Sequence, residues 1–331
     1  MKGCDTPMTR YLVKRGVFRG SEFGLVDVGA SGGIDSRWNV FGDQLRAWGF
    51  DLLEGEVERL NALGRKDVSY HAYRVGYKAY DELLERVPFS IPERPAISND
   101  PGPRFSVWKA ITAVEVQKFY DGSGSLRQSE RRIDLDDFFA GDLRRAVDFI
   151  KTDTDGNDYE VLLGAANLIK ESPVIGVQAE CNLHGRLHPH VQVFANLDRM
   201  MRQAGFSLFD MSTWRYSRAA LPSRFVWGSP GPTDKGQLWW GDFLYFRDLG
   251  DPAYEANWDY QPTMTKVLKL ACCFESYDLA DCAAELLLKY ERALRALVDV
   301  EHCLDLLTAV SAPGLSYREY QRRFEKTGLI K

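Results

Sequence analysis

The sequence predicts an α/β fold built around a mainly parallel, seven-stranded sheet with an antiparallel edge. Two observations lead to this prediction. Short apolar runs alternate with stretches of helical periodicity, and helices of this length between strands imply right-handed crossovers that join parallel strands. The last two runs, at 206–212 and 238–248, are instead predicted to pair antiparallel at the sheet edge.

The first half of the predicted sheet comes from three strands. The first lies at 23–28 (FGLVDV) and ends in the glycine turn GASGG, and 35–49 follow as a helix of mixed face. The second strand is placed at 50–56 (FDLLEGE), with acidic residues at its end, before a helix that stops near Gly64. A third strand at 68–75 follows from its alternating pattern.

The pattern weakens between about 76 and 130, where five prolines and the loop DGSGS interrupt every candidate element. Long irregular stretches inside compact domains are usually functional lids or disordered segments, so this insertion is expected to lie over a site or to be disordered. Regular structure then returns. Strands are predicted at 146–153 and 172–182, with helices at 133–146, 159–172 and 193–205.

The two ends of the chain differ from this central domain, which is placed at 23–250. Residues 251–331 are rich in alanine and leucine without a strand signal, and they predict a helical region whose apolar stripe packs on the central domain or on a second subunit. Residues 1–22 carry a local charge excess of +3 and are interpreted as a solvated arm, with contact to an anionic surface as the alternative.

Composition excludes several classes of protein. With 331 residues, 45% apolar and 27% charged, the chain is typical of a globular protein and not of a disordered, fibrous or membrane one. A net charge of −5 gives no field to hold a phosphate backbone, so no nucleic-acid partner is expected. No apolar run approaches 18 residues and the first 22 lack a signal-like apolar core, which predicts a cytoplasmic protein without a transmembrane segment.

The six cysteines predict reduced, mostly buried thiols. They form neither CxxC pairs nor the dense pattern of a disulfide scaffold. Cys272, Cys273 and Cys282 fall in an apolar helical pattern, where cysteine behaves as a small hydrophobic residue.

The glycine turn after the first strand is the first candidate binding element. A dinucleotide site needs the pattern GxGxxG, and Ser31 and Ile34 occupy its second and third glycine positions. Small residues in the turn still let the backbone approach a ligand closely. In a nucleotide-type fold a carboxylate at the end of the second strand can accept hydrogen bonds from both ribose hydroxyls, and Glu54 is placed for that role. The alternative is a solvated charge at a strand end.

Two further clusters end neighbouring strands. Lys151, Asp153 and Asp155 follow the strand at 146–153, and Glu180 and His184 belong to a group that follows the next strand. Ligands of open α/β sheets bind outside the carboxyl ends of the strands, so both clusters are expected to face the same crevice as the glycine turn. A turn or a helix cap is the structural alternative for the acids of the first loop, Asp155 and Asp158.

A metal site stays an open hypothesis at this edge. His184, His188 and His190 share one short loop, but their spacing is not that of a helical zinc pair. Asp153, Glu180 and Asn182 offer the hard oxygen ligands that Mg²⁺ prefers, so a magnesium ion bridging them to an acceptor diol is a second hypothesis.

These motifs together resemble the FkbM-type branch of the class I S-adenosylmethionine-dependent methyltransferases. VDVGASGG resembles its glycine turn, LLEGEVERL its acidic strand end, and IDLDDFF with VDFIKTDTDGNDYEVLLGA its long central signature, while VIGVQAECN and WGDFLYFRD resemble its later strands. The resemblance covers about 23–247. The family usually has asparagine at Ser31, glutamate at Asp155, and alanine-glutamate at Asn157-Asp158, so the identity of the catalytic carboxylate stays open.

The resemblance implies a Rossmann-like methyltransferase fold and methyl transfer from S-adenosylmethionine to a hydroxyl of a sugar, glycan or other secondary metabolite. The residues expected to bind the cofactor are Asp27, Gly29, Ala30, Ser31, Gly33, Glu54 and Asp153. An alcohol needs a base before it can attack, so Asp153 is the first candidate and His184 the second, with Glu180 or Asp155 as orienting partners and Lys151 beside them.

Two rival functions remain from the sequence. A methyltransferase-like domain without activity could use the helices of 253–331 to bind a partner, because fold does not imply activity. A nicotinamide-dependent oxidoreductase would use the same kind of sheet, although the incomplete glycine fingerprint argues against it. A homo-oligomer formed through the C-terminal helices is a further hypothesis about partners.

Overall fold

The computed structural model describes residues 5–86, 127–171, 174–185, 188–217, 221, 223–225 and 232–327. Seven strands form one sheet in the order β3-β2-β1-β6-β7-β9-β8. These strands are β1 (Phe23–Val28), β2 (Leu45–Asp51), β3 (Val68–Ala72), β6 (Phe149–Thr152), β7 (Gly176–Asn182), β8 (Ser207–Tyr216) and β9 (Gln237–Phe246). The first five are parallel and β9 pairs antiparallel with both β7 and β8, which confirms the predicted sheet.

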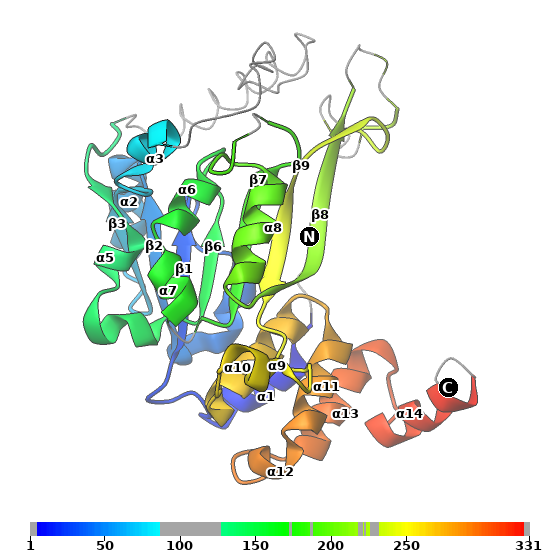
Figure 1. Ribbon diagram of the computed structural model, residues 1–331. Coiled ribbons are helices and arrows are strands. Elements are labelled where there is room, and N and C mark those ends of the chain that lie inside the picture. The colour runs from blue at the N-terminus through cyan, green and yellow to red at the C-terminus, as the bar shows by residue number, and fades with distance from the viewer. Residues whose placement is uncertain are drawn as a thin grey trace.

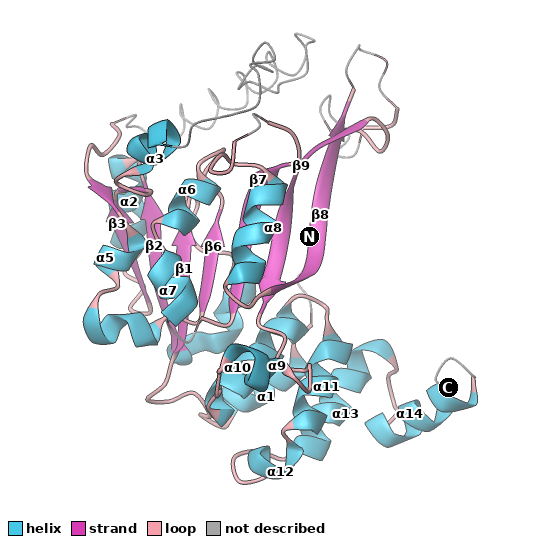
Figure 2. Ribbon diagram, viewed as in Figure 1, coloured by secondary structure: helices cyan, strands magenta, loops and turns pink. Residues whose placement is uncertain are grey.

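Helices cover both faces of this sheet, and Figure 2 shows α6, α7 and α8 in front of it. The front layer contains α5 (Leu135–Phe138), the 3₁₀ helix η2 (Gly141–Ala146), α6 (Asp158–Leu163), α7 (Ala166–Glu171) and α8 (Phe194–Gln203). The 3₁₀ helix η1 (Ser36–Gln44) and α2 (Glu54–Ala62) pack on the opposite face. Strand β1 is buried along its whole length because it lies between the two layers, with Phe23 and Leu25 in one core and Val26 and Val28 in the other.

The second strand lies five residues earlier than predicted. The helix expected at 35–49 is only η1, and Gly42 interrupts it with a φ of 53°, a left-handed conformation that favours glycine. Strand β2 then starts at Leu45, and Leu45 and Trp48 face opposite cores. As a result Asp51 is the acidic residue at the strand end, and Glu54 is the first residue of α2.

The N-terminal segment is a packed helix from Pro7 onward, so the prediction of a solvated arm over 1–22 was wrong for these residues. Helix α1 (Pro7–Lys14) has Met8 and Leu12 fully buried. Its first turn donates three hydrogen bonds to the Glu275 carboxylate, from the Met8 and Thr9 amides at 2.8 and 2.7 Å and from the Thr9 hydroxyl at 2.5 Å. A buried carboxylate thereby satisfies amides at the helix start, which have no partner inside the helix.

The C-terminal helices lie below the sheet in Figure 1, with α10 beside α1. They are α9 (Tyr254–Trp258), α10 (Met264–Ser276), α11 (Ala280–Lys289), α12 (Glu291–Leu294), α13 (Val300–Ser311) and α14 (Tyr317–Lys326). Helix α10 is buried from Val267 to Ser276 and shares one hydrophobic core with Phe23 and Phe149 of the sheet. The change of composition near residue 250 therefore marks a change of secondary structure inside one continuous core.

The described cysteines are free, mostly buried thiols, as predicted. Cys181, Cys272, Cys273, Cys282 and Cys303 are free, and all but Cys282 are buried. Among the described residues, no helix has the length and apolar character needed to cross a bilayer.

The predicted insertion or lid at 76–130 falls largely on 87–126, which lie outside the described residues. On its described flanks are α3 (Tyr80–Arg86) and a small parallel pair of strands, β4 (Arg74–Val75) and β5 (Arg132–Ile133).

Candidate active site

The glycine turn after β1 connects the carboxyl ends of the central strands by backbone hydrogen bonds. The amides of Gly29 and Ala30 both donate to the Phe50 carbonyl of β2, at 2.9 and 3.0 Å, and the Gly33 amide donates to the Ala30 carbonyl at 2.9 Å. Gly29 has a φ of 87°, and a Cβ built on it would lie 1.8 Å from the Asp153 carbonyl oxygen. The turn therefore brings the ends of β1, β2 and β6 into direct contact, which only glycine permits at this position.

We expect Gly29→Ala to destabilise the protein by at least about 2 kcal/mol more than Gly32→Ala. Gly32 is a matched control because its φ of 80° is similar, yet a Cβ there has no neighbour within 4 Å. Both variants carry the strain of a left-handed backbone, and only Gly29→Ala also clashes with Asp153. Urea unfolding of both proteins measures the difference, and equal losses would show that the close approach is unimportant.

A cavity of about 690 Å³, here called the strand-end cavity, opens beside this turn at the carboxyl ends of β1, β2 and β6. Its lining includes Gly29, Ser31, Asp51, Ser129, Asp153 and Asp155. The Asp51 carboxylate accepts hydrogen bonds from the Ser31 hydroxyl at 2.7 Å and from the Leu53 amide at 2.8 Å, so its position is fixed from both sides.

Glu54 does not line this cavity. Its carboxylate pairs with Arg127 at 2.9 Å, outside the turn. The acid at the end of the second strand is therefore Asp51 and not Glu54. The sequence prediction missed Asp51 because it placed the strand too late in the chain. The short, nearly continuous apolar run LRAWGFD, ending in an acid, was the signal that could have found it.

Ala30 and Gly33, the other predicted turn residues, do not line the cavity and pack against neighbouring side chains. Ala30 is buried against Gly49, and a Cβ added to Gly33 would lie 3.3 Å from the Tyr70 hydroxyl. The Gly32 amide donates to Glu56 at 2.9 Å, so the start of α2 also anchors the turn. Of the turn, Gly29 and Ser31 reach the cavity itself.

A partly buried lysine, Lys151, lies between two acids on the sheet face next to this cavity. Lys151 Nζ lies 3.3 Å from both Asp27 and Asp153. Burial lowers the pKa of Lys151, but the two carboxylates outweigh it and raise the pKa, so the ammonium stays charged. Asp27 is buried, and burial raises its pKa against the opposing effect of Lys151. Asp27 therefore acts here as a buried partner of Lys151, behind the cavity wall.

Glu180 of β7 and Asp242 of β9 are directly paired in the strand register. Together with Asp27 and Asp153 they form a row of acids on the sheet face, here called the acid wall. Burial, with the neighbouring charges of Asp158 and Asp153, raises the pKa of Glu180 well above its ordinary value, and its carboxyl is hydrogen-bonded to Asp153. Burial and the charge of Asp153 raise the pKa of Asp242 to about 6. The raised pKa favours the protonated form of Glu180 beside Asp153.

The acids of the loop after β6 differ in exposure: Asp155 lines the cavity, and Asp158 is buried. Asp155 lines the strand-end cavity with a φ of 53°, and burial raises its pKa. Asp158 is buried and accepts hydrogen bonds from the Thr154 amide and hydroxyl at 3.2 and 3.0 Å and from the Gln192 amide at 3.1 Å. The hydrogen bonds of Asp158 therefore stabilise the loop, whereas Asp153 and Asp155 line the cavity and can contact a ligand.

His184 contacts the first residues of β9. Its Nε2 is 2.9 Å from the Leu238 carbonyl and 3.0 Å from the Gln237 amide nitrogen, and the side chain is exposed. Neither His184 nor the pair His188 and His190 lines the strand-end cavity. In the described part of the chain no group of three or more His, Cys, Asp or Glu side chains is arranged to hold a metal ion.

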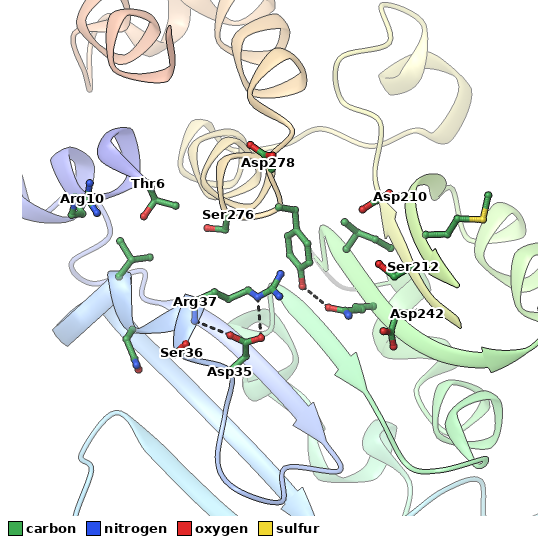
Figure 3. Close-up of a pocket in the computed structure, with 16 residues that line it drawn as sticks. Thr6, Arg10, Asp35, Ser36, Arg37, Asp210, Ser212, Asp242, Ser276 and Asp278 are labelled. Atoms are coloured by element: carbon green, nitrogen blue, oxygen red, sulfur yellow. Dashed lines mark hydrogen bonds and ion pairs between the residues drawn. The ribbon is translucent and has the colours of Figure 1, made fainter. Parts of the chain in front are cut away.

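A second cavity, of about 1160 Å³, lies on the other side of the acid wall, between the sheet face and helix α10 (Figure 3). Its lining includes Arg37, Gln178, Asp210, Asp242, Ser276 and Tyr277. The Tyr277 hydroxyl donates to Gln178 at 2.7 Å. Arg37 pairs with Asp35 at 3.1 Å, as a dashed line in Figure 3 shows. Asp242 lines this cavity and Asp153 lines the other, and the charge of Asp153 raises the pKa of Asp242.

The glycine turn, the strand-end acid and the acid wall occupy one sheet edge, and the sequence around them matches a known family. The family described as the methyltransferase FkbM domain matches residues 27–208. The chain belongs to the FkbM methyltransferase family. The match begins at Asp27 and includes every candidate of the turn, the loop after β6 and the end of β7.

Solved structures similar to this FkbM methyltransferase differ strongly in sequence. A methyltransferase from Aquifex aeolicus shares 12% identity, with 72% of this chain and 89% of that chain covered and a TM-score of 0.30. The 1,6-didemethyltoxoflavin-N1-methyltransferase of Burkholderia thailandensis shares 13%, covering 73% and 79% with a TM-score of 0.30. No curated protein sequence matches the chain. Its family assignment rests on the sequence match over 27–208.

Proposed function

We propose that this FkbM methyltransferase binds S-adenosylmethionine in the strand-end cavity and methylates a hydroxyl of a sugar, glycan or other secondary metabolite. The observation that carries the proposal is the joint lining of one cavity by the Gly29 turn, the Asp51 carboxylate and Asp153. A cavity of about 690 Å³ lies within the usual range of sites for small ligands, roughly 300–1,000 Å³.

The residues present fit an adenosine-type ligand. Asp51 is held at the strand end with its carboxylate in the cavity, where it would accept hydrogen bonds from both ribose hydroxyls. Gly29 and Ser31 leave the turn without bulky side chains, so that the ligand can approach the backbone. When bound, S-adenosylmethionine supplies an electrophilic methyl group on a sulfonium.

The acid wall supplies the proton chemistry that an alcohol acceptor needs. Asp153 lines the cavity, and we assign to it removal of the acceptor's hydroxyl proton. Protonated Glu180 donates a hydrogen bond to Asp153, and Lys151 neutralises part of its charge, so both fix the direction in which the carboxylate points. Positioning the hydroxyl beside this base supplies much of the expected rate enhancement.

The first test is the thermal stability of the purified protein with S-adenosylhomocysteine, and with NADH in parallel. A ligand at a hundred times its Kd adds about 2.7 kcal/mol, which should raise the Tm by several degrees. We expect a shift with S-adenosylhomocysteine alone. A shift with NADH alone would favour the oxidoreductase alternative, and no shift with either would favour a binding module without catalysis.

Asp51→Asn is expected to weaken S-adenosylhomocysteine binding about tenfold or more, because hydrogen bonds to a charged group contribute roughly 1.5–3 kcal/mol each. Glu54→Gln is the matched control: Glu54 pairs with the exposed Arg127, and such surface pairs contribute at most about 1 kcal/mol to stability. Its Kd should change less than about threefold. Titration calorimetry gives both values, and the reverse order of effects would return the ribose role to Glu54.

A further inference from the structure

We propose that the second cavity is the acceptor site and that it takes an acceptor carrying a protonated amine in addition to the hydroxyl that is methylated. This inference rests on the proposed function and specifies the substrate class. It depends on three features of the cavity: its position beside Asp153, two acids without a direct ion pair among the described residues, and a buried hydroxyl without a hydrogen bond.

The position follows from the strand register. Lys151 of β6 is paired with Gln178 of β7, and Glu180, two residues further along β7, is paired with Asp242 of β9. Gln178 and Asp242 line the second cavity, and the Glu180 carboxyl is hydrogen-bonded to Asp153. An acceptor in this cavity would therefore approach the same carboxylate that lines the strand-end cavity, from the opposite side of the wall.

Charge in this cavity is unbalanced. Its two arginines already have carboxylate partners: Arg10 pairs with Asp5, and Arg37 pairs with Asp35 and also stacks over the Tyr277 ring at 4.4 Å. None of the ion pairs between described residues includes Asp210 or Asp242, although the charges of Lys151 and Arg37 act on Asp242 from farther away.

Asp210 and Asp242 lie on the same face of the sheet (Figure 3). Ser212 of β8 is paired with Asp242, and Asp210 is two residues before Ser212 on the same strand. A bound ammonium group would supply the missing positive charge through charge-assisted hydrogen bonds.

A buried hydroxyl on the facing helix lacks a partner. Ser276, in the last turn of α10, is 5% exposed, lines the cavity, and its Oγ makes no hydrogen bond to any described residue. A buried hydroxyl without a partner is costly, and rotation of the Ser276 side chain toward a polar ligand group would remove that cost. Figure 3 shows Ser276 on the helix side of the cavity and Asp210 and Asp242 on the opposite side, so an extended ligand could reach both sides.

The size and lining favour a polyol over a flat apolar acceptor. A volume of about 1160 Å³ exceeds the usual upper range for ligand cavities, roughly 1,000 Å³, which leaves room for more than one sugar ring. Gln178, Ser212 and Ser276 offer groups for hydroxyls, and Asp210 and Asp242 offer them for an amine. Aminated saccharides combine both kinds of group.

The test compares ligands that differ only in charge, with the full chain saturated with S-adenosylhomocysteine. The probes are the β-1,4-linked glucosamine trimer and kanamycin, each beside its fully N-acetylated form, and binding is measured by titration calorimetry. We expect at least one amine-bearing probe to bind about tenfold or more tightly than its acetylated form, the scale of a hydrogen bond to a charged group. Equal binding of both forms, or no binding by any probe, would overturn the amine assignment.

Variants then locate the binding. Asp210→Asn with Asp242→Asn should reduce the preference for the amine to less than about threefold, while Asp142→Asn, at an exposed position on η2, should retain it. A preference that survives the double substitution would place the amine outside this cavity. S-adenosylhomocysteine affinity is measured in the same samples, so a failure of the cofactor proposal is seen separately from a failure of the acceptor proposal.

Discussion

Asp153→Asn is expected to lower turnover by at least about a hundredfold while changing the S-adenosylhomocysteine Kd less than about threefold. The amide keeps the shape of the carboxylate but cannot accept the acceptor's proton. Lys151 retains Asp27 as a partner at 3.3 Å, so the substitution leaves no isolated buried charge. Transfer of a radiolabelled methyl group to an acceptor that the wild-type protein methylates gives the rate, and calorimetry gives the Kd.

Two further variants decide whether the effect belongs to Asp153. Glu180→Gln replaces a carboxyl that burial keeps protonated by a neutral group that can still donate to Asp153, so its loss should stay below about tenfold. Glu58→Gln, at an exposed position on α2, should match the wild type. A hundredfold loss in Glu180→Gln together with an active Asp153→Asn would move the base to Glu180.

Asp148→Ala is expected to reduce the free energy of unfolding by about 3–5 kcal/mol, the usual cost of removing one partner from a buried ion pair. Asp148 is fully buried before β6 and pairs with two lysines of α10, Lys266 and Lys269, the latter at 2.7 Å. It also accepts a hydrogen bond from the Gly24 amide at 2.7 Å. Without it two ammonium groups stay in a nearly dry core, because Lys266 and Lys269 are both nearly buried.

Urea unfolding measures this loss, with Asp142→Ala on η2 as the exposed control. Asp148→Asn serves if the alanine variant is insoluble, since the amide retains an acceptor for Gly24. Adding Lys269→Met to Asp148→Asn should recover part of the loss, because the pair is coupled and the methionine removes one stranded charge. A loss below about 1 kcal/mol in Asp148→Ala would mean that the lysines find other partners or reach solvent.

The error at the second strand shows where local pattern stops being sufficient. The sequence around 35–56 has helical and strand signals in succession, and placing the boundary five residues late made Glu54 the strand-end acid. Two tertiary factors set the true boundary: the left-handed backbone at Gly42, and burial of Leu45 and Trp48 in opposite cores. Neither is visible in a window of a few residues, since both depend on what packs against the segment.

The sequence by itself determined the α/β class, the strand-and-helix order, the glycine turn, the acid loop at Asp153 and the family. Each of these depends on neighbours in the chain: periodicity, turn residues and contiguous motifs. Only the tertiary structure decided that α1 is packed, that Asp51 reaches the cavity, and that Asp148 meets Lys266 and Lys269, which are 118 and 121 residues away. It also decided that β8, β9 and α10 enclose a second cavity. Such contacts follow from which elements the hydrophobic core brings together, and no local spacing encodes them.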